Sequence, residues 1–198
     1  IIKRIYNWID LDVFTPESPN GLSAKTNNGD KFTIFCASAG WEMGSDRLKD
    51  LLRLAEIIDS SMQIVVAGKV DEAVTLPQNV IAVGYISNPT ELAEYYRKAD
   101  VYVHFSREDT FGKVIAEALA CGTPAIVYNS TACPEIVGNG CGYVVECGDI
   151  YAIADKCKEI HQNGKEAYST QCSSTSSARF DKKTLINETV KTYKKLLD

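Results

Sequence analysis

The stretch FSREDTFGKVIAEALACGTPAI at residues 105–126 holds the side chains best suited to chemistry. Its polar part ends at Phe111-Gly112, and Glu117 then stands as a carboxylate among Val, Ile, Ala and Leu neighbours. Burying a carboxylate is costly unless hydrogen-bond donors reach it, and a vicinal diol such as a ribose supplies two donors. Two interpretations of Glu117 stay open: a ligand-binding carboxylate, or a residue on a solvated face or bonded to a backbone amide.

Gly112 is placed to open a helix directly after a loop. A glycine there lets a ligand approach the backbone, and the amides of a first helical turn favour an anion or an oxygen-rich group. Glu108 and Asp109 precede Glu117 by nine and eight residues. Eight helical residues would separate two carboxylates by ~12 Å, against roughly 5–9.5 Å in a glycoside-hydrolysing pair. The spacing therefore argues against hydrolysis, and a solvated loop or a helix cap is the alternative role of both acids.

Three other features that could carry chemistry have plainer interpretations. Asp10-Leu11-Asp12 is a D-x-D motif, but it precedes the whole predicted sheet, so a turn is expected. His104 lies inside a predicted strand, which favours a packed histidine, with a secondary role open because that strand leads to the polar loop. The seven cysteines form no C-x-x-C pair near a histidine, so we expect no metal site but small buried side chains in a reducing cytosol.

The elements that must position these residues alternate between short apolar runs and amphipathic segments. Strands are predicted at residues 31–38, 62–67, 79–83, 101–105, 124–128 and 143–145, and helices at about 46–58, 88–98, 113–121, 134–137 and 150–162. Continuously apolar strands separated by helices predict an α/β fold, a Rossmann-like doubly wound parallel sheet with helices on both faces. Ligands bind such sheets at the carboxyl ends of the strands, so we expect function in the loops after Ser38, Phe105 and Tyr128.

Three parts of the chain are distinguished by composition. Residues 1–30 are predicted to be an entry segment and a turn-rich loop, with 1–13 somewhat apart from the core, and 31–162 the Rossmann-like domain. Residues 163–198 form a C-terminal part in which the Ser-, Thr- and Gln-rich run 163–178 predicts a linker. The apolar stripe of residues 182–197 predicts a C-terminal helix that packs back on the domain.

The composition excludes some classes of protein. The 198 residues include 21 Lys and Arg against 26 Asp and Glu, a formal charge of −5. This acidic balance argues against sequence-independent nucleic-acid binding, and no apolar run is long enough to span a membrane. The sequence shows no signal-peptide pattern. Because it begins at Ile1 and not at Met, we expect it to be a piece of a longer protein.

The run D-T-F-G-x4-E followed by A-L-A-C-G-T-P, at residues 109–124, resembles the signature of retaining glycosyltransferases of the GT-B fold, the large family 4 group. The resemblance implies that Glu117 holds the ribose of a nucleotide. It also implies that the first acid contacts the donor sugar, and both Asp109 and Glu108, one place earlier, fit that position. With this acid, Thr110, Phe111 and Gly112 are the implied sugar-binding residues.

Further segments carry the same resemblance. The runs YNWID at 6–10, NSTACPEIV at 129–137 and GCGYVVECGD at 140–149 are similar to the entry segment, the P-E loop and the G-x-G run of the family. The loop at residues 38–49 is similar to a basic loop that neutralises the donor diphosphate. The implied diphosphate-binding residues are Arg47, Gly40 and, in reserve, Lys49, although Glu42 and Asp46 nearby would repel a diphosphate.

The resemblance implies the C-terminal donor-binding domain of a glycosyltransferase. Such an enzyme transfers a sugar from a UDP-, GDP- or ADP-sugar, with retention and with no metal and no cofactor, to an acceptor glycan or lipid-linked sugar. The family context is bacterial surface polysaccharide synthesis in the cytoplasm, with the full-length enzyme peripheral to the inner membrane. The acceptor site and the usual catalytic His belong to an N-terminal domain, so this fragment is expected to be inactive alone. The alternatives are a nucleotide-sugar 2-epimerase and a non-catalytic nucleotide-binding module.

Overall fold

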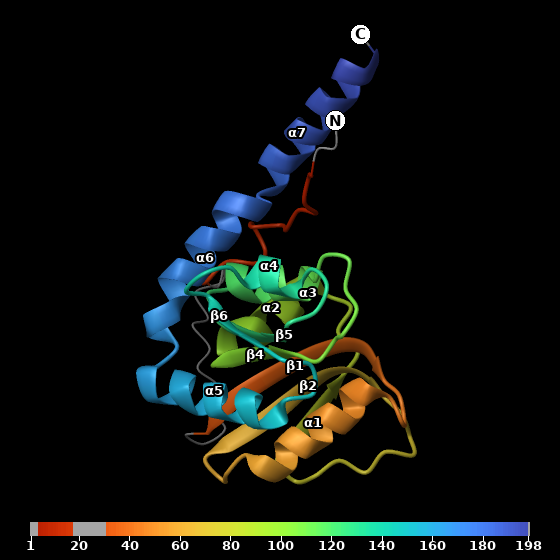
Figure 1. The fold of residues 1–198 in the computed structure, drawn as a ribbon, viewed down its shortest axis with the longest axis vertical. Helices are drawn as coiled ribbons and strands as arrows, with labels where there is room; N and C mark the ends of the chain where they lie inside the picture. Colours follow the sequence, from red (N-terminus) through yellow and green to blue (C-terminus); the bar gives the residue numbers. More distant parts are fainter. Residues whose placement is uncertain (1–3, 18–30, 198) are drawn as a thin grey trace.

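The computed structural model describes residues 4–17 and 31–197, which form a parallel sheet covered by helices (Figure 1). The strands are β1 (Phe32–Trp41), β2 (Met62–Val70), β3 (Val80–Gly84), β4 (Val101–His104), β5 (Ala125–Tyr128) and β6 (Gly142–Val145). The helices are α1 (Asp46–Ile57), α2 (Pro89–Lys98), α3 (Lys113–Ala120), α4 (Cys133–Val137), α5 (Ile150–Asn163), α6 (Glu166–Phe180) and α7 (Lys182–Leu197).

The six strands lie in the order β3-β2-β1-β4-β5-β6, and every neighbouring pair is parallel. The prediction of a doubly wound, Rossmann-like sheet is thus confirmed. The order of the strands reverses between β1 and β4, and at such a switch point the following loops diverge and leave a crevice. The carboxyl ends of β1 and β4 therefore mark the expected binding site.

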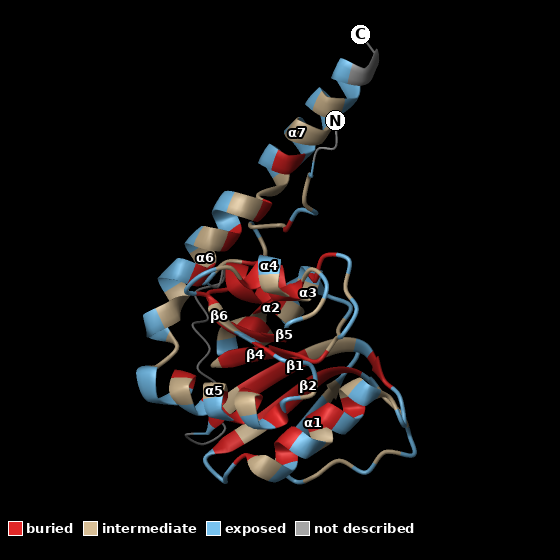
Figure 2. Ribbon diagram, viewed as in Figure 1, coloured by how far each residue is buried: buried red, intermediate tan, exposed pale blue. Residues whose placement is uncertain are grey.

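Two apolar layers lie on the two faces of the sheet (Figures 1 and 2). Because side chains alternate along a strand, Phe35 of β1 belongs to one layer, while Ile34 and Cys36 belong to the other. Helices α1 and α5 cover the second face, and α2, α3 and α4 cover the first, where Tyr96 and Ile115 are fully buried.

Strands β1 and β2 extend three residues beyond their predicted ends at Ser38 and Ala67. Gly68 does not end β2, because β1 approaches it so closely that a Cβ there would lie 2.2 Å from the Ser38 carbonyl oxygen. The pairing shifts register at this point and then resumes to Trp41, whose indole Nε1 donates to the Ala67 carbonyl at 3.0 Å. The loop expected after Ser38 therefore begins after Trp41.

The linker predicted at residues 163–178 is wrong, because most of this run lies in helix α6. Its small residues allow the helix to approach α3, and Ser176 is fully buried with its hydroxyl donating to the Ala116 carbonyl at 3.0 Å. Cys172 and Phe180 are also fully buried. Tertiary packing thus stabilises a helix whose own composition does not favour one.

Among the side chains of α7 that the structure describes, the buried one lies in the first turn, so the predicted docking of the helix on the domain holds for that turn and not further along it. Leu185 is 6% exposed, whereas Ile186, Val190 and Tyr193 are 40%, 47% and 66% exposed. Figure 1 shows the helix projecting away from the sheet, past the N-terminal segment.

The N-terminal segment is part of the core, contrary to the prediction that residues 1–13 lie apart from it. Ile9 is fully buried, and its amide donates to the Phe180 carbonyl at 2.9 Å, at the junction of α6 and α7. The predicted turn at the D-x-D motif is confirmed, since the amides of Val13 and Phe14 donate to the Asp10 carbonyl. The predicted loop at 18–30 lies outside the described residues.

Candidate functional site

Glu117 lies in the middle of α3 and is 5% exposed. Its two polar contacts are long: Lys113 Nζ lies 3.6 Å from one carboxylate oxygen, and the Tyr96 hydroxyl lies 3.5 Å from the other. A hydrogen bond from a hydroxyl or ammonium to a carboxylate is normally about 2.5–2.9 Å long. Burial is the main cause that raises the pKa of Glu117 to about 7, and Lys113 opposes it. The carboxylate is thus buried without a short hydrogen bond from any residue in 4–17 or 31–197.

Gly112 positions the start of α3. It adopts the left-handed conformation at φ 77°, and a Cβ there would lie 2.7 Å from Ile115 Cδ1. No side chain caps the helix, so its first amides and the positive end of its dipole face the polar loop. Phe111 just before it is buried against Tyr6 and Phe180, which anchors the loop.

Asp109 lies beside the last residue of β4. Its carboxylate accepts a hydrogen bond of 2.6 Å from His104 Nε2, and the other ring nitrogen, Nδ1, lies 3.1 Å from the Tyr102 hydroxyl. The hydrogen bond from His104 is the main cause that lowers the pKa of Asp109, so this carboxyl is an anion. Burial is the main cause that raises the pKa of Tyr102, with further contributions from Cys36, Glu117 and Asp109.

The structure separates the two acids that the sequence left as alternatives. Glu108 is exposed, in a turn closed by a hydrogen bond of 3.0 Å from the Ser106 hydroxyl to its carbonyl, and Thr110 is exposed as well. Asp109 is half-buried and points back to the strand. Asp109 is therefore held at the end of β4, whereas Glu108 faces solvent.

A second loop, residues 129–133, is held against the first one. The Asp109 amide donates to the Thr131 hydroxyl at 3.0 Å, and the Ser130 hydroxyl donates to the Arg107 carbonyl. Thr131 adopts a positive φ of 48° without being glycine, a strained conformation that surrounding contacts must hold. The course of this loop brings Cys133 toward the pair formed by His104 and Asp109.

The loop after β4 is also tied to α1 on the other side. Asp50 is 3% exposed, and its carboxylate accepts hydrogen bonds from Arg107 Nη2 at 2.9 Å and from the Tyr128 hydroxyl at 2.7 Å. The Arg107 guanidinium lies over the Tyr128 ring. One buried carboxylate thus joins α1, the loop after β4 and the end of β5.

Arg47 turns from the first turn of α1 back onto the end of β1. Its Nη1 donates to the Gly40 carbonyl at 3.2 Å and to the Ser38 hydroxyl. Its Nε is buried and has no hydrogen-bond partner among the residues that the structure describes. The positive charge of Arg47 contributes to the lowered pKa of Asp109, which places the cation near the crevice.

Lys49 and Gly40 lie differently from Arg47. Lys49 is 60% exposed and pairs with Asp46 at 3.3 Å on the outside of α1. Gly40 is buried, and the Glu42 carboxylate covers it so closely that a Cβ would lie 2.4 Å from Oε1. A cavity of about 510 Å³ opens beside it at the ends of β1 and β2. Most of the charged side chains that line this cavity are carboxylates. It is lined by Ala39, Gly40, Trp41, Glu42, Lys69, Asp71 and Glu72.

Sequence reasoning missed the polar partners of His104. It predicted a packed histidine, and the ring is 7% exposed, yet hydrogen-bonding groups face both ring nitrogens. The available signal was its place as the last residue of the strand that leads to the loop. Nothing in the sequence indicates that Cys133 lies near His104, because the course of the loop at 129–133 brings the two residues together.

A family model described as Glycosyl transferases group 1 matches residues 22–175. The chain belongs to this family. Among its relatives, N-acetyl-alpha-D-glucosaminyl L-malate synthase of Bacillus anthracis is 26% identical over 177 residues, which are 82% of this group 1 chain and 46% of that enzyme. The chain therefore spans about half the length of this relative.

Solved structures show the same fold. HepE of Anabaena, in complex with UDP and glucose, superposes with a TM-score of 0.79 at 20% identity and covers 97% of this group 1 chain and 56% of HepE. The C-terminal domain of LpcC, a glycosyl transferase group 1 family protein of Francisella tularensis, superposes with a TM-score of 0.70 at 20% identity, over 88% of this chain and 99% of that domain. The chain thus has the fold of one half of a GT-B glycosyltransferase. In residues 4–17 and 31–197 we find no helix whose length and apolar character would allow it to cross a membrane.

Proposed function

We propose that this domain binds a nucleotide-diphosphate sugar at the carboxyl ends of β1 and β4, and that the full-length protein transfers the sugar to an acceptor. The observation that carries the proposal is Glu117, which is 5% exposed and whose polar contacts are 3.5 and 3.6 Å long. A ribose diol would give this carboxylate two short hydrogen bonds and so offset the cost of its burial.

The other groups of the crevice fit the rest of the donor. Asp109, held as an anion by His104, would accept hydrogen bonds from hydroxyls of the sugar. The first amides of α3 and the Arg47 guanidinium would stabilise the negative charge that develops on the leaving diphosphate. With these groups supplying the positive charge, we propose retaining transfer that needs no metal ion and no cofactor, with Gly40 at the phosphates and Lys49 as a reserve cation.

The comparisons support the proposal at the level of the family. HepE was solved in complex with UDP and glucose, and N-acetyl-alpha-D-glucosaminyl L-malate synthase is about twice as long as this chain. We therefore propose a UDP-, GDP- or ADP-sugar donor and an acceptor glycan or lipid-linked sugar bound mainly by a further, N-terminal domain. A cytoplasmic location and a role in bacterial surface polysaccharide synthesis belong to the same proposal.

The test is calorimetric titration of the chain with UDP, GDP and ADP. We expect one of them to bind, and Glu117→Ala to weaken that binding by about tenfold or more, since each hydrogen bond to a charged group contributes about 1.5–3 kcal/mol. Glu56→Gln, on the exposed side of α1, is the matched control and should bind like the wild type. Binding of none of the three nucleotides, or equal binding by Glu117→Ala, would contradict the proposal.

Transfer itself needs a separate measurement. The chain alone is expected to bind the donor without transferring its sugar to an acceptor, because the acceptor is assigned to another domain. Robust transfer by this chain alone would show that assignment to be wrong.

A further inference from the structure

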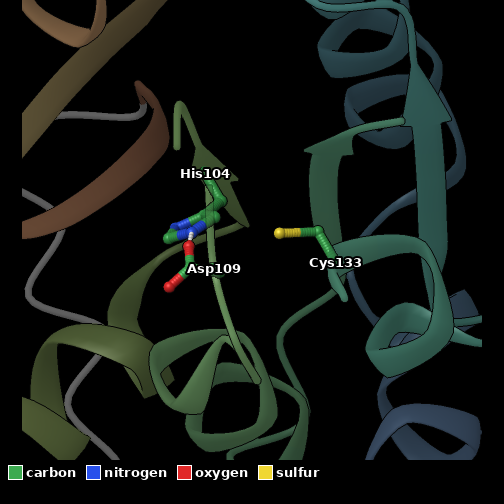
Figure 3. A group of neighbouring side chains, drawn as sticks. All are labelled: His104, Asp109 and Cys133. Atoms are coloured by element: carbon green, nitrogen blue, oxygen red, sulfur yellow. Dashed lines mark hydrogen bonds and ion pairs between the residues drawn. The ribbon is translucent and has the colours of Figure 1, made fainter. Parts of the chain in front are cut away.

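The thiol of Cys133 lies against the hydrogen-bonded pair of His104 and Asp109 (Figure 3). A ring nitrogen of His104, an Asp109 carboxylate oxygen and Cys133 Sγ all lie within 4.8 Å of one another. His104 ends β4, Asp109 lies in the loop that follows, and Cys133 begins α4, so three separate segments converge. His104 and Cys133 are buried, while the Asp109 side chain is 28% exposed and opens the group to solvent.

An imidazole nitrogen, a carboxylate oxygen and a thiolate sulfur are the ligand types that bind Zn²⁺ in proteins. With zinc–ligand distances of about 2.0–2.3 Å, tetrahedral ligand atoms stand roughly 3.3–3.6 Å apart. His104 Nε2 and Asp109 Oδ2 are 2.6 Å apart, and the sulfur lies within 4.8 Å of a ring nitrogen and of a carboxylate oxygen of this pair. Small rotations of both the Asp109 and the Cys133 side chains are needed to bring the three atoms to these separations.

The surroundings already orient these ligands. The Tyr102 hydroxyl lies 3.1 Å from His104 Nδ1 and 3.3 Å from the Ala37 carbonyl oxygen, so the ring is held with Nε2 toward Asp109 and Cys133. A metal-bound histidine normally has such a partner on its second nitrogen. When Nε2 binds a cation, its proton is carried on Nδ1, which donates to the Tyr102 oxygen, while the Tyr102 hydroxyl donates to Ala37.

We propose that His104, Asp109 and Cys133 form a binding site for a soft divalent cation of the Zn²⁺ class, with water in the fourth position. Binding releases the thiol proton of Cys133 to solvent, and the sulfur then binds as a thiolate. Because the cation occupies the Asp109 carboxylate, it competes with a donor sugar; this second part rests on the proposed function. The cation acts here as an inhibitor and takes no part in transfer.

The first experiment titrates the chain with Co²⁺, which replaces Zn²⁺ in tetrahedral sites and shows a thiolate-to-cobalt charge-transfer band. We expect a band that saturates at a single equivalent and that Zn²⁺ removes by displacement. Cys133→Ser should abolish the band, and His104→Gln should weaken Co²⁺ binding at least tenfold. Cys147→Ser is the matched control, because Cys147 is an exposed cysteine, and it should keep the band. Thermal melting of each variant shows whether it is folded.

The metal site is wrong if the folded wild type gives no charge-transfer band, or if the band persists in Cys133→Ser or is lost in Cys147→Ser. A second titration, of UDP-, GDP- and ADP-glucose with and without Zn²⁺, tests the competition. We expect Zn²⁺ to weaken donor binding at least tenfold in the wild type and not in Cys133→Ser, which also corrects for Zn²⁺ held by the nucleotide itself. Equal weakening in both proteins refutes the competition. Absence of donor binding in metal-free protein, beside an intact cobalt band, refutes the proposed function and leaves the metal site supported.

Discussion

Glu117 combines a contribution to binding with a cost to stability. Its burial raises its pKa to about 7, so near neutral pH the folded protein holds about half of these carboxyls protonated. The unfolded chain, with the ordinary pKa of 4.5, releases the proton earlier. The native state therefore binds more protons than the unfolded state between these two pH values, and stability falls as pH rises through that window.

Glu117→Gln is expected to stabilise the domain at alkaline pH. The variant cannot ionise at this position. It therefore keeps the free energy of unfolding that the wild type loses between about pH 4.5 and 7. We expect the free energy of unfolding of the variant to gain about 2–3 kcal/mol on the wild type between pH 5 and pH 8, measured by urea denaturation at both values. Parallel pH profiles for the two proteins would contradict the raised pKa.

Donor binding should respond to pH in the opposite sense. A carboxylate that accepts two hydroxyl hydrogen bonds must be ionised, so nucleotide affinity is expected to rise as pH increases from 6 to 8, by up to about tenfold. Glu117→Gln is the reference in calorimetry, since it retains every other titrating group, including the diphosphate. If affinity changes equally with pH in both proteins, Glu117 does not titrate on binding.

For single residues, the sequence indicates features that depend on neighbouring residues along the chain. The apolar neighbours of Glu117 single it out in the sequence, but they left a solvated position open, and its burial is a finding of the structure. The bond between His104 and Asp109 does not follow from any such pattern, because it depends on how the five-residue loop turns back. The approach of Cys133 depends further on Thr131, which adopts a left-handed conformation that no rule for threonine predicts.

Among the elements, α1 has a role beyond covering the sheet. Through Asp50 it holds Arg107, and through Arg107 the loop that carries Asp109. The same carboxylate binds Tyr128 at the end of β5, so α1 and two strand ends form one connected unit. The position of the loop is therefore fixed by α1, which lies on the opposite face of the sheet from α3.

Asp50→Asn should loosen the loop after β4. The amide keeps the shape but loses the charge that holds Arg107, and we expect a loss of about 1–3 kcal/mol in unfolding free energy. Hydrogen exchange in residues 106–112 should become faster. Asp46→Asn is the matched control, because Asp46 also contacts Arg107 but is 58% exposed, and it should cost less than ~1 kcal/mol. Unchanged exchange in Asp50→Asn would show that the loop is held by other contacts.

The periodicity of apolar residues predicted the strands and the helices that cover the sheet. It did not predict helix α6 or the full length of β1 and β2. Strands of continuous apolar residues and helices with capping signals such as Asn88-Pro89 are where expected, to within a few residues. Helix α6 was missed because its Ser- and Thr-rich composition does not indicate a helix, and its contact with α3 through the buried Ser176 is tertiary. The ends of β1 and β2 were missed because Gly68 is needed for close approach of the strands and not for a turn.

For the whole molecule, the N-terminal segment joins parts of the fold that are far apart in sequence. Ile9 packs at the junction of α6 and α7, and Lys182 pairs with Asp10 at 2.9 Å. Arg97 of α2 donates to the carbonyls of Val13 and Thr15. The segment thus completes the apolar layer on which α2, α3 and α4 also pack.

Ile9→Ala is expected to destabilise the whole domain, because a fully buried side chain leaves a cavity in this layer. The loss should be about 2–5 kcal/mol in denaturant unfolding. Ile186→Ala on α7, where the side chain is 40% exposed, is the matched control and should change stability by less than ~0.5 kcal/mol. Similar small effects of both substitutions would mean that the segment contributes little to the domain.

The contact between Ile9 and Phe180 also sets an order of events during synthesis. Ribosomes add about 5–20 residues per second, so Ile9 is made on the order of ten to thirty seconds before Phe180. Until then the apolar side chain of Ile9 lacks the junction of α6 and α7 on which it packs in the native protein. The N-terminal segment of this domain can therefore reach its final place only after α6 and the start of α7 have emerged.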